Sequence, residues 1–401
     1  MTTEEIRSQF PQLQRTEYGK PLVYLDNAAT SLRPQSVIDR WSDISAHSTA
    51  NLHRAVHHVA SEATEAYENA RRAVAEFINA PETEEVIFTS GATHSLNLAA
   101  FGIAESFLKD GDEIIIGEAE HHSNIVPWQM VGGRKHITIK VLPVDDRGRL
   151  CVEQLESLIS PSTRLLCVAH ISNVLGLVNP IRQLAEICRK HGVLLLVDGA
   201  QGIVHQKVDV QALGCDFYAF SGHKMYGAPG TGVLWGRRAL LEIMPPMFGG
   251  GEMIDSVKWS GSTWAPVPRK FEAGTQNISG TPCFIQAIET LKSMPQDTSV
   301  RDYIYGTLVR EPGVKLYGTT DNLNNKVPVF SFTVDGVHHE DLALILDKTG
   351  IAVRSGQMCA EPLMDRFGVT GMLRASFAPY NTMQEAEYFV SSLRKAICML
   401  R

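Results

Sequence analysis

The feature that most constrains the fold is an alternation of short apolar runs with segments of helical periodicity, which begins near Glu85 and continues to Ser221. Each apolar run has the length of a buried strand, and helical patterns lie between several of them. This alternation predicts an α/β domain with a mainly parallel sheet, in which ligands bind beyond the carboxyl ends of the strands. The expected strands are Glu85–Thr89, Glu113–Gly117, Ile137–Leu142, Leu165–Ile171, Val193–Asp198 and Phe217–Ser221, with helices beginning near His94, Val152 and Ile181.

The remainder of the chain predicts a long loop and a second, smaller unit. From Phe248 to Arg269 the sequence is irregular and rich in Gly, Trp, Ser and Pro, which is typical of a long functional loop. We expect a large domain over residues 21–280 and a smaller C-terminal α+β domain over residues 281–401, on which residues 1–20 pack. The patterns that indicate the smaller domain are a strand at Val327–Val334, a helix at His339–Thr349 and a strand at Ile351–Arg354.

Charge and composition disfavour several classes of protein. Hydrophobic residues make up 44% of the 401 residues and charged residues 20%, which is typical of a soluble globular protein. The net charge of −7 disfavours nucleic acid or an anionic membrane as the main partner. No apolar run approaches the ~20 residues that cross a bilayer, and the acidic N-terminus lacks a signal-peptide pattern. The seven cysteines include no C-x-x-C pair, so we expect reduced thiols and a cytoplasmic location.

Three expected strand ends carry side chains that together indicate a cofactor site. Asp198 closes a buried apolar strand, where a carboxylate is costly unless it faces a cation such as the pyridine nitrogen of pyridoxal 5′-phosphate (PLP). Lys224 follows the next strand, after Ser221 and His223, and a lysine in a cleft can form a Schiff base with an aldehyde. Thr93, Ser221 and His223 offer donors for a phosphate. Singly, Asp198 also suits a helix cap and Lys224 a surface position, but their pairing on successive strands favours the cofactor.

Two residues in the C-terminal part suit chemistry on an amino acid. Cys359 lies in a short polar loop five residues beyond Arg354, and a nearby cation favours the nucleophilic thiolate. The other six cysteines mostly fit apolar patterns that are typical of buried structural positions. Arg374 offers a planar guanidinium that can bind a carboxylate through two parallel hydrogen bonds. A salt bridge between domains explains Arg374 as well, as long as only its own sequence is considered.

The histidines allow a competing interpretation as a metal site. His121 and His122 are adjacent, so their side chains face different ways on a helix or a strand. His53 and His57 could lie on one face of a helix, but no carboxylate or cysteine motif completes a zinc set. We therefore expect no metal.

The chain resembles the fold-type I PLP enzymes of the class V aminotransferase family, from Tyr24-Leu-Asp-Asn-Ala-Ala29 to Arg374-Ala-Ser-Phe377. Within this family, Arg354-Ser-Gly-x-x-Cys359-Ala-x-Pro362 is similar to the group II cysteine desulfurases, the SufS/CsdA type. The segments Asn51-Leu-His53-Arg54 and Ser172-Asn173-Val-Leu-Gly176 match that group too. The resemblance implies an enzyme that takes sulfur from L-cysteine, leaves L-alanine and carries a persulfide on Cys359. It also implies a homodimer and a sulfur acceptor protein of the SufE/CsdE kind, in iron–sulfur cluster or other sulfur-cofactor assembly.

The resemblance further implies a role for each site residue. Lys224 would carry the cofactor and move the substrate proton, and His121 would stack on the ring and assist as an acid or base. Asn173 and Arg374 would bind the substrate carboxylate, while His53 and Arg354 would line the pocket. The other cofactor-binding residues would be Asp198 at the ring nitrogen, Gln201 at the ring oxygen, Thr93, Ser221 and His223 at the phosphate, and Thr275 at the phosphate of the neighbouring subunit.

Three departures from the family pattern bear on activity. Met358 stands where histidine commonly precedes the cysteine, Ala92 stands where threonine is frequent, and Lys292–Gly313 is shorter and contains Pro295. The alternatives are another PLP enzyme of the same fold, such as an aminotransferase or a selenocysteine lyase, or a non-enzymatic sulfur carrier. Use of cysteine sulfinate is also compatible with the group. Cys359 disfavours an aminotransferase, and the pair of Asp198 and Lys224 disfavours a carrier.

Overall fold

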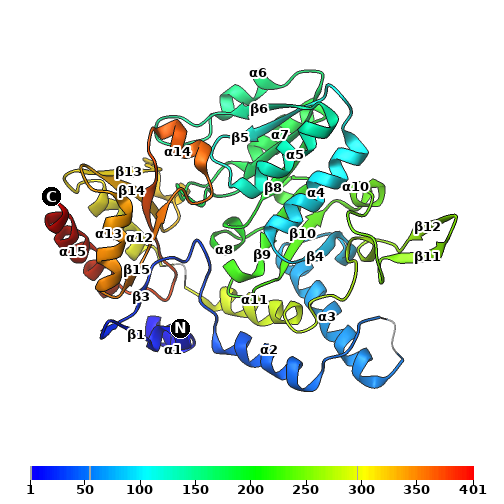
Figure 1. Ribbon diagram of the computed structural model, residues 1–401, viewed down its shortest axis with the longest axis horizontal. Helices are drawn as coiled ribbons and strands as arrows, with labels where there is room; N and C mark the ends of the chain where they lie inside the picture. The colour runs from blue at the N-terminus through cyan, green and yellow to red at the C-terminus, as the bar shows by residue number, and fades with distance from the viewer. Residues whose placement is uncertain (1, 54–55, 296) are drawn as a thin grey trace.

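The computed structural model describes residues 2–53, 56–295 and 297–401, so Arg54 of the motif Asn51–Arg54 lies outside the described residues. A large part contains a seven-stranded sheet, and a smaller part at its side contains a four-stranded sheet (Figure 1). The strand order of the large sheet is β4-β10-β9-β8-β7-β5-β6. The expected α/β fold with a mainly parallel sheet is confirmed.

All six strands expected in the large sheet are present, with ends that differ by two residues at most. They are β4 (Val86–Thr89), β5 (Glu113–Gly117), β6 (Thr138–Leu142), β7 (Thr163–Ala169), β8 (Leu194–Asp198) and β9 (Phe217–Ser221). A further strand, β10 (Gly232–Gly236), was not expected, and it runs antiparallel to both β4 and β9. Because β10 is antiparallel to both neighbours, β4 and β9 point the same way, and the carboxyl ends of β4, β9, β8, β7 and β5 meet at one edge.

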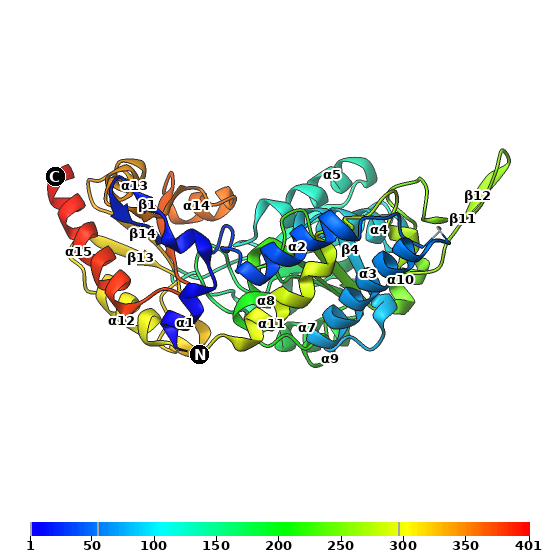
Figure 2. The same ribbon diagram turned by 90° about the horizontal axis from the view of Figure 1, so that it is seen from below.

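Helices cover both faces of the large sheet, as the burial of its central strands on both faces requires. Leu166 and Val168 of β7 belong to one apolar core, whereas Leu165 and Cys167 belong to the other. Figure 2 shows α5 and α7 on opposite sides of this layer. No helix within the described ranges is both long and apolar enough to cross a membrane. The main helices around the sheet are α2 (Gln35–His47), α3 (His58–Phe77), α4 (Ala92–Phe107), α5 (Val126–Lys135), α7 (Ile181–His191) and α11 (Phe284–Ser293).

The local sequence explains where α7 begins and ends. Pro180 precedes its first residue, and Gly192 ends it in the left-handed conformation with φ of 67°. Its buried residues Ile181, Leu184, Ala185 and Cys188 recur at helical spacing and form one apolar stripe. The segment expected to begin a helix near Val152 starts as a 3₁₀ turn, η4 (Val152–Gln154), and continues as the short α-helix α6 (Leu155–Leu158).

The smaller sheet is antiparallel and has the order β13-β14-β17-β16. The strand expected at Ile351–Arg354 is divided in two: β15 (Ile351–Ala352) pairs in parallel with β3 (Val23–Tyr24), and β16 (Arg354–Gly356) joins the sheet. One apolar core unites this sheet with its helices. The other elements here are β13 (Val314–Tyr317), β14 (Val329–Val334), β17 (Met372–Ser376), α12 (Ser299–Leu308), α13 (His339–Lys348), α14 (Glu361–Phe367) and α15 (Met383–Leu400).

The N-terminal helix α1 (Thr3–Ser8) contacts the C-terminal part. Arg7 Nη1 donates to the carbonyl of Tyr380 at 2.7 Å and forms an ion pair with Glu385 at 2.8 Å. The assignment of residues 1–20 to the smaller domain and the domain boundary near residue 280 stay predictions.

The interpretation of Phe248–Arg269 as an irregular loop is wrong. The segment contains a hairpin of β11 (Ile254–Lys258) and β12 (Gly261–Trp264), which projects from the large part (Figures 1 and 2). Neither strand has a buried residue, so no alternation of apolar and polar residues marks the hairpin in the sequence.

Candidate active site

A cavity of about 190 Å³ lies between the carboxyl edge of the large sheet and the strands β16 and β17. Its lining combines strand ends of the large sheet with side chains of the smaller sheet. Ten of the thirteen predicted site residues line it: Thr93, His121, Asn173, Asp198, Ser221, His223, Lys224, Arg354, Cys359 and Arg374.

Asp198 and Lys224 meet because β8 and β9 are neighbouring parallel strands, with Asp198 opposite Ala219. Asp198 ends β8 and accepts a hydrogen bond from the N–H of Ala200 at 2.9 Å, and Lys224 lies in the turn just after β9. Burial raises the pKa of Asp198, and the Lys224 charge opposes that shift. Burial lowers the pKa of Lys224, and the Asp198 charge opposes it. The pair therefore offers a buried carboxylate beside an amine that loses its proton more readily than an exposed lysine.

The turn from β4 into α4 offers donors for an anion. The N–H of Ala92, the first residue of α4, donates to Ser221 Oγ at 2.7 Å, and Thr93 Oγ1 lies 2.8 Å from Ser123 Oγ. The first N–H groups of a helix lack intrahelical acceptors and attract negative charge. This turn and the end of β9 come together because Gly232 of β10 pairs with residues at both strand ends.

His121 and His223 lie in the cavity wall as neutral rings. Burial, aided by the Lys224 charge, lowers the pKa of each histidine to about 4. The N–H of Ser123 donates to His121 Nδ1 at 3.1 Å, so the neutral ring carries its proton on Nε2. His223 Nδ1 lies 3.1 Å from Thr30 Oγ1.

Glu120 is a buried carboxylate behind the cavity wall that was not singled out in the sequence. It is buried beside His121 and accepts hydrogen bonds from the N–H of Ala169 at 2.8 Å and from Asn124 Nδ2 at 2.7 Å. Burial raises its pKa to about 8, and the Asp198 charge adds to this shift. A carboxylate soon after the apolar strand Glu113–Gly117 was the available signal, since the same pattern drew attention to Asp198.

Arg374 and Arg354 lie directly opposite each other on β17 and β16. The guanidinium of Arg374 is buried and donates to the carbonyl of Asn173 at 3.0 Å and to Asp26 Oδ1 at 2.9 Å. Its Nε is buried without a hydrogen-bond partner among the described residues. A buried donor of this kind calls for an acceptor, which a substrate carboxylate could supply. Asp26, which orients Arg374, was not singled out in the sequence.

Cys359 lines the cavity and is also exposed to solvent. Five other cysteines are buried, as their apolar surroundings predicted, but Cys398 on α15 is exposed as well. Cys359 is close enough to Lys224 and Arg374 to interact with both charges. The thiol therefore shares the cavity with both the amine of Lys224 and the guanidinium of Arg374.

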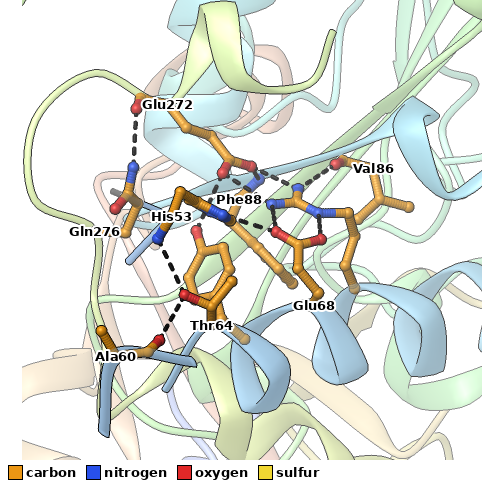
Figure 3. A network of polar contacts seen from close by, with 10 residues as sticks. His53, Ala60, Thr64, Glu68, Val86, Phe88, Glu272 and Gln276 are labelled. Atoms are coloured by element: carbon orange, nitrogen blue, oxygen red, sulfur yellow. Dashed lines mark hydrogen bonds and ion pairs between the residues drawn. The ribbon is translucent and has the colours of Figure 1, made fainter. Parts of the chain in front are cut away.

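Three predicted residues lie elsewhere. Gln201 donates through Nε2 to the carbonyl of Ala28 at 2.7 Å and lines a larger neighbouring cavity. His53 lies 3.5 Å from Glu68, in a polar network that Figure 3 shows, and Thr275 is exposed three residues beyond Glu272 of the same network. His53 and Thr275 therefore both lie next to this network, and neither lines the cavity of its own chain.

The polar groups that line the cavity fit the chemistry of PLP. That cofactor needs a carboxylate for its ring nitrogen, an amine for its aldehyde, and N–H and hydroxyl donors for its phosphate. Asp198, Lys224 and the turn at Ala92–Thr93 match these needs in turn. Across residues 2–53, 56–295 and 297–401, no three His, Cys, Asp or Glu side chains gather in a way that could hold a metal ion.

Known proteins with similar sequences and structures share this architecture. Residues 23–389 match the family Aminotransferase class-V. The chain is 43% identical to a probable cysteine desulfurase of Vibrio cholerae, over 100% of both chains, and 43% identical to a cysteine desulfurase of Serratia proteamaculans, over 98% of this chain and 97% of that one. The crystal structure of the cysteine desulfurase CsdA from Escherichia coli matches with a TM-score of 0.91 and 38% identity, over 100% of both chains. The chain therefore belongs to the class-V aminotransferase family, among full-length relatives that are named cysteine desulfurases.

Proposed function

We propose that the protein is a PLP-dependent cysteine desulfurase that leaves L-alanine and carries the sulfur as a persulfide on Cys359. The observation that carries the proposal is the exposed thiol of Cys359 in the same cavity as Lys224, Asp198 and Arg374. An aminotransferase needs no thiol at this place, and a sulfur carrier needs no buried pair of carboxylate and lysine.

The cofactor would be held by residues from three strand ends. Lys224 would bind its aldehyde, Asp198 would face its ring nitrogen, and Thr93, Ser221 and His223 would hold its phosphate. When bound, PLP supplies an electron sink for the charge that develops on the substrate carbon atoms. Gln201 and His121 remain the expected ligands of the ring, although Gln201 bonds to Ala28 here.

The substrate would be oriented by the arginines of the smaller sheet. Arg374, with its buried and unpaired Nε, binds the α-carboxylate, and Arg354 lies beside it. Lys224 Nζ takes the α-proton, since its lowered pKa increases the share of neutral amine. His121 Nε2, which bears the proton of the neutral ring, would act as an acid or base for the groups that leave the substrate. Asn173 Nδ2 donates one of its two N–H groups to the carbonyl of Met358 at 2.9 Å, so the second N–H would be the donor for the substrate carboxylate.

The sulfur would leave through Cys359. Its Sγ forms a bond to the substrate sulfur while the bond from that sulfur to the β-carbon breaks, and the β-carbon keeps the electron pair and gains a proton. The exposure of Cys359 lets an acceptor protein of the SufE/CsdE kind reach the persulfide.

A homodimer would explain the placement of Thr275 and His53. Both residues lie outside the cavity of their own chain, and one buried ion-pair network supports both of their segments (Figure 3). We propose that Thr275 reaches the phosphate in the second subunit and that His53 lies in its pocket.

The test follows turnover of L-cysteine by the purified protein with PLP and an excess of a reducing thiol, which reduces the persulfide and releases its outer sulfur as sulfide, and it measures alanine and sulfide. We expect equal amounts of both from the wild type and from Cys398→Ala, which removes the other exposed thiol and is the matched control. Cys359→Ala should lose both products with cysteine but keep activity with selenocysteine, whose β-group leaves more readily. Alanine formation from cysteine by Cys359→Ala at the wild-type rate would refute the role of Cys359. Absence of alanine from the wild type, with PLP bound, would refute the proposed substrate.

A further inference from the structure

The backbone at the candidate nucleophile has an uncommon conformation. Met358 and Cys359 are consecutive residues with φ of 54° and 55°, and both carry a Cβ atom. The left-handed region is unfavourable for such residues, so it persists only where the surroundings hold it. The Cys359 loop, residues 357–361, must therefore be fixed by contacts from outside itself.

Hydrogen bonds from two distant segments provide these contacts. Asn173 Nδ2 donates to the carbonyl of Met358 at 2.9 Å. The N–H of His122 donates to the carbonyl of Cys359 at 2.7 Å. The N–H of Glu361 donates to His122 Nε2 at 3.0 Å. His122 thus holds the loop at Cys359 through its main chain and two residues further on through its ring, while Asn173 holds it at Met358, before the thiol.

The ring of His122 also replaces a missing helix cap. The N-cap of α14 is Ala360, which has no side-chain acceptor for the first N–H groups of the helix. His122 Nε2 accepts from Glu361, the first residue of α14, so the end of the loop is fixed at the helix start. The side chain of Met358 is buried in an apolar cluster that includes Val174 and Leu363, which anchors the other end.

His122 directly follows His121, which lines the cavity of Lys224. One dipeptide therefore connects the candidate acid–base group and the candidate nucleophile, although His122 and Cys359 are 237 positions apart in the sequence. A shift of the His122 ring would move the thiol relative to the bond that it must attack.

We propose that His122 is a positioning residue that holds the Cys359 loop in its left-handed conformation and so sets the place of the nucleophilic sulfur. This inference rests on the proposed desulfurase function. It assigns to His122 no contact with substrate or cofactor; its effect passes through Cys359.

The test compares His122→Ala with His122→Gln, whose amide oxygen can accept the same hydrogen bond as Nε2. The control is His338→Ala, because His338 likewise accepts a main-chain N–H, that of Glu340, far from the cavity. For His122→Ala we expect kcat with L-cysteine to fall about tenfold, the loss that one hydrogen bond of ordinary strength corresponds to, with KM changed less than twofold. Turnover of selenocysteine should stay within twofold of the wild type, and His122→Gln should recover most of the cysteine activity.

Amide hydrogen exchange of the peptide that covers residues 357–364 gives a readout that does not depend on the reaction. It should become at least tenfold faster in His122→Ala, near the wild-type rate in His122→Gln, and unchanged in His338→Ala. Unchanged exchange, or faster exchange with full cysteine turnover, would overturn the inference. Equal losses with cysteine and selenocysteine would overturn it too, because they would indicate general damage to the site. A wild type that forms no alanine would instead count against the proposed function, and exchange would still decide whether His122 holds the loop.

Discussion

Glu272→Gln tests whether a buried ion pair supports the segment that carries Thr275. Arg71 Nη1 of α3 and Glu272 Oε1 are 2.6 Å apart, and each side chain is 2% exposed. Gln276 Nε2 donates to the carbonyl of Glu272 at 3.1 Å, which ties the segment around Thr275 to the pair. The remaining partners of the two side chains belong to α3 and β4 and are Tyr67, Glu68, Val86 and Phe88 (Figure 3).

The expected loss of stability follows from the partner that stays behind. Removing one member of a buried ion pair costs about 3–5 kcal/mol, because the other charge remains buried without compensation. Glu68 stays 2.8 Å from Arg71 Nε, so we expect the lower end, about 3 kcal/mol. With about 2.1 cal/mol/K of unfolding entropy per residue, a chain of 401 residues that unfolds as a unit should lose about 4 °C in Tm.

Thermal unfolding at pH 7 measures this shift, with Arg72→Ala as the control. Arg72 is exposed on the same helix and hydrogen-bonds to Asn69, so its removal should change Tm by less than 1 °C. Adding Arg71→Met to Glu272→Gln should recover part of the loss, since no buried charge then lacks a partner. A Tm shift below 1 °C for Glu272→Gln, or no recovery in the double variant, would contradict the reasoning.

Three further predictions concern pH and a close backbone contact. Burial raises the pKa of Glu120 from 4.5 to about 8, so the folded state holds a proton that the unfolded chain has lost, and stability falls as pH rises through that window. Glu120→Gln should therefore gain Tm relative to the wild type between pH 5 and pH 9, and a constant difference would contradict this assignment. Burial lowers the pKa of Lys326 from 10.5 to about 7, so the free energy of unfolding should rise from pH 7 to pH 10 in the wild type. The rise should be less steep in Lys326→Met. Equal slopes of Tm against pH for the two proteins would contradict this prediction. A Cβ at Gly232 would lie 2.4 Å from Gly91 Cα, in the turn from β4 into α4. Gly232→Ala should therefore displace this turn and weaken PLP binding at least tenfold in an absorbance titration. Unchanged affinity would exclude that displacement.

The parts of the site that the sequence predicts are those that local pattern and topology determine together. Asp198 and Lys224 each follow a continuous apolar run, and parallel strands bring their carboxyl ends to one edge. Their meeting therefore needs only the strand assignments, which the sequence indicates clearly. β10 escaped notice because a short apolar run between glycines at 232–236 gives no sign of strand direction, yet this strand aligns β4 with β9.

The parts that the sequence does not predict depend on contacts between distant segments. Asp26 orients Arg374 from 348 positions away, and His122 accepts from Glu361 across 239 positions. No periodicity or spacing records such a pairing, because the first arises only when the segment after β3 packs on β17 and the second only when α14 packs on the turn after β5. The hairpin β11–β12 was missed for the opposite reason, since none of its strand residues is buried against the described part of the chain, and so no apolar pattern marks it.

Met358 illustrates how a departure from the family pattern can be accommodated by the fold. Where relatives commonly have a polar histidine, this chain buries an apolar side chain in the cluster that includes Val174 and Leu363. The substitution thus exchanges a polar neighbour of Cys359 for an anchor of its loop. The basic side chains that share the cavity with the thiol are Lys224, Arg374 and Arg354. Lys224 and Arg374 also serve the substrate in the proposed function, so binding of the substrate and reactivity of the sulfur would be coupled through these two side chains.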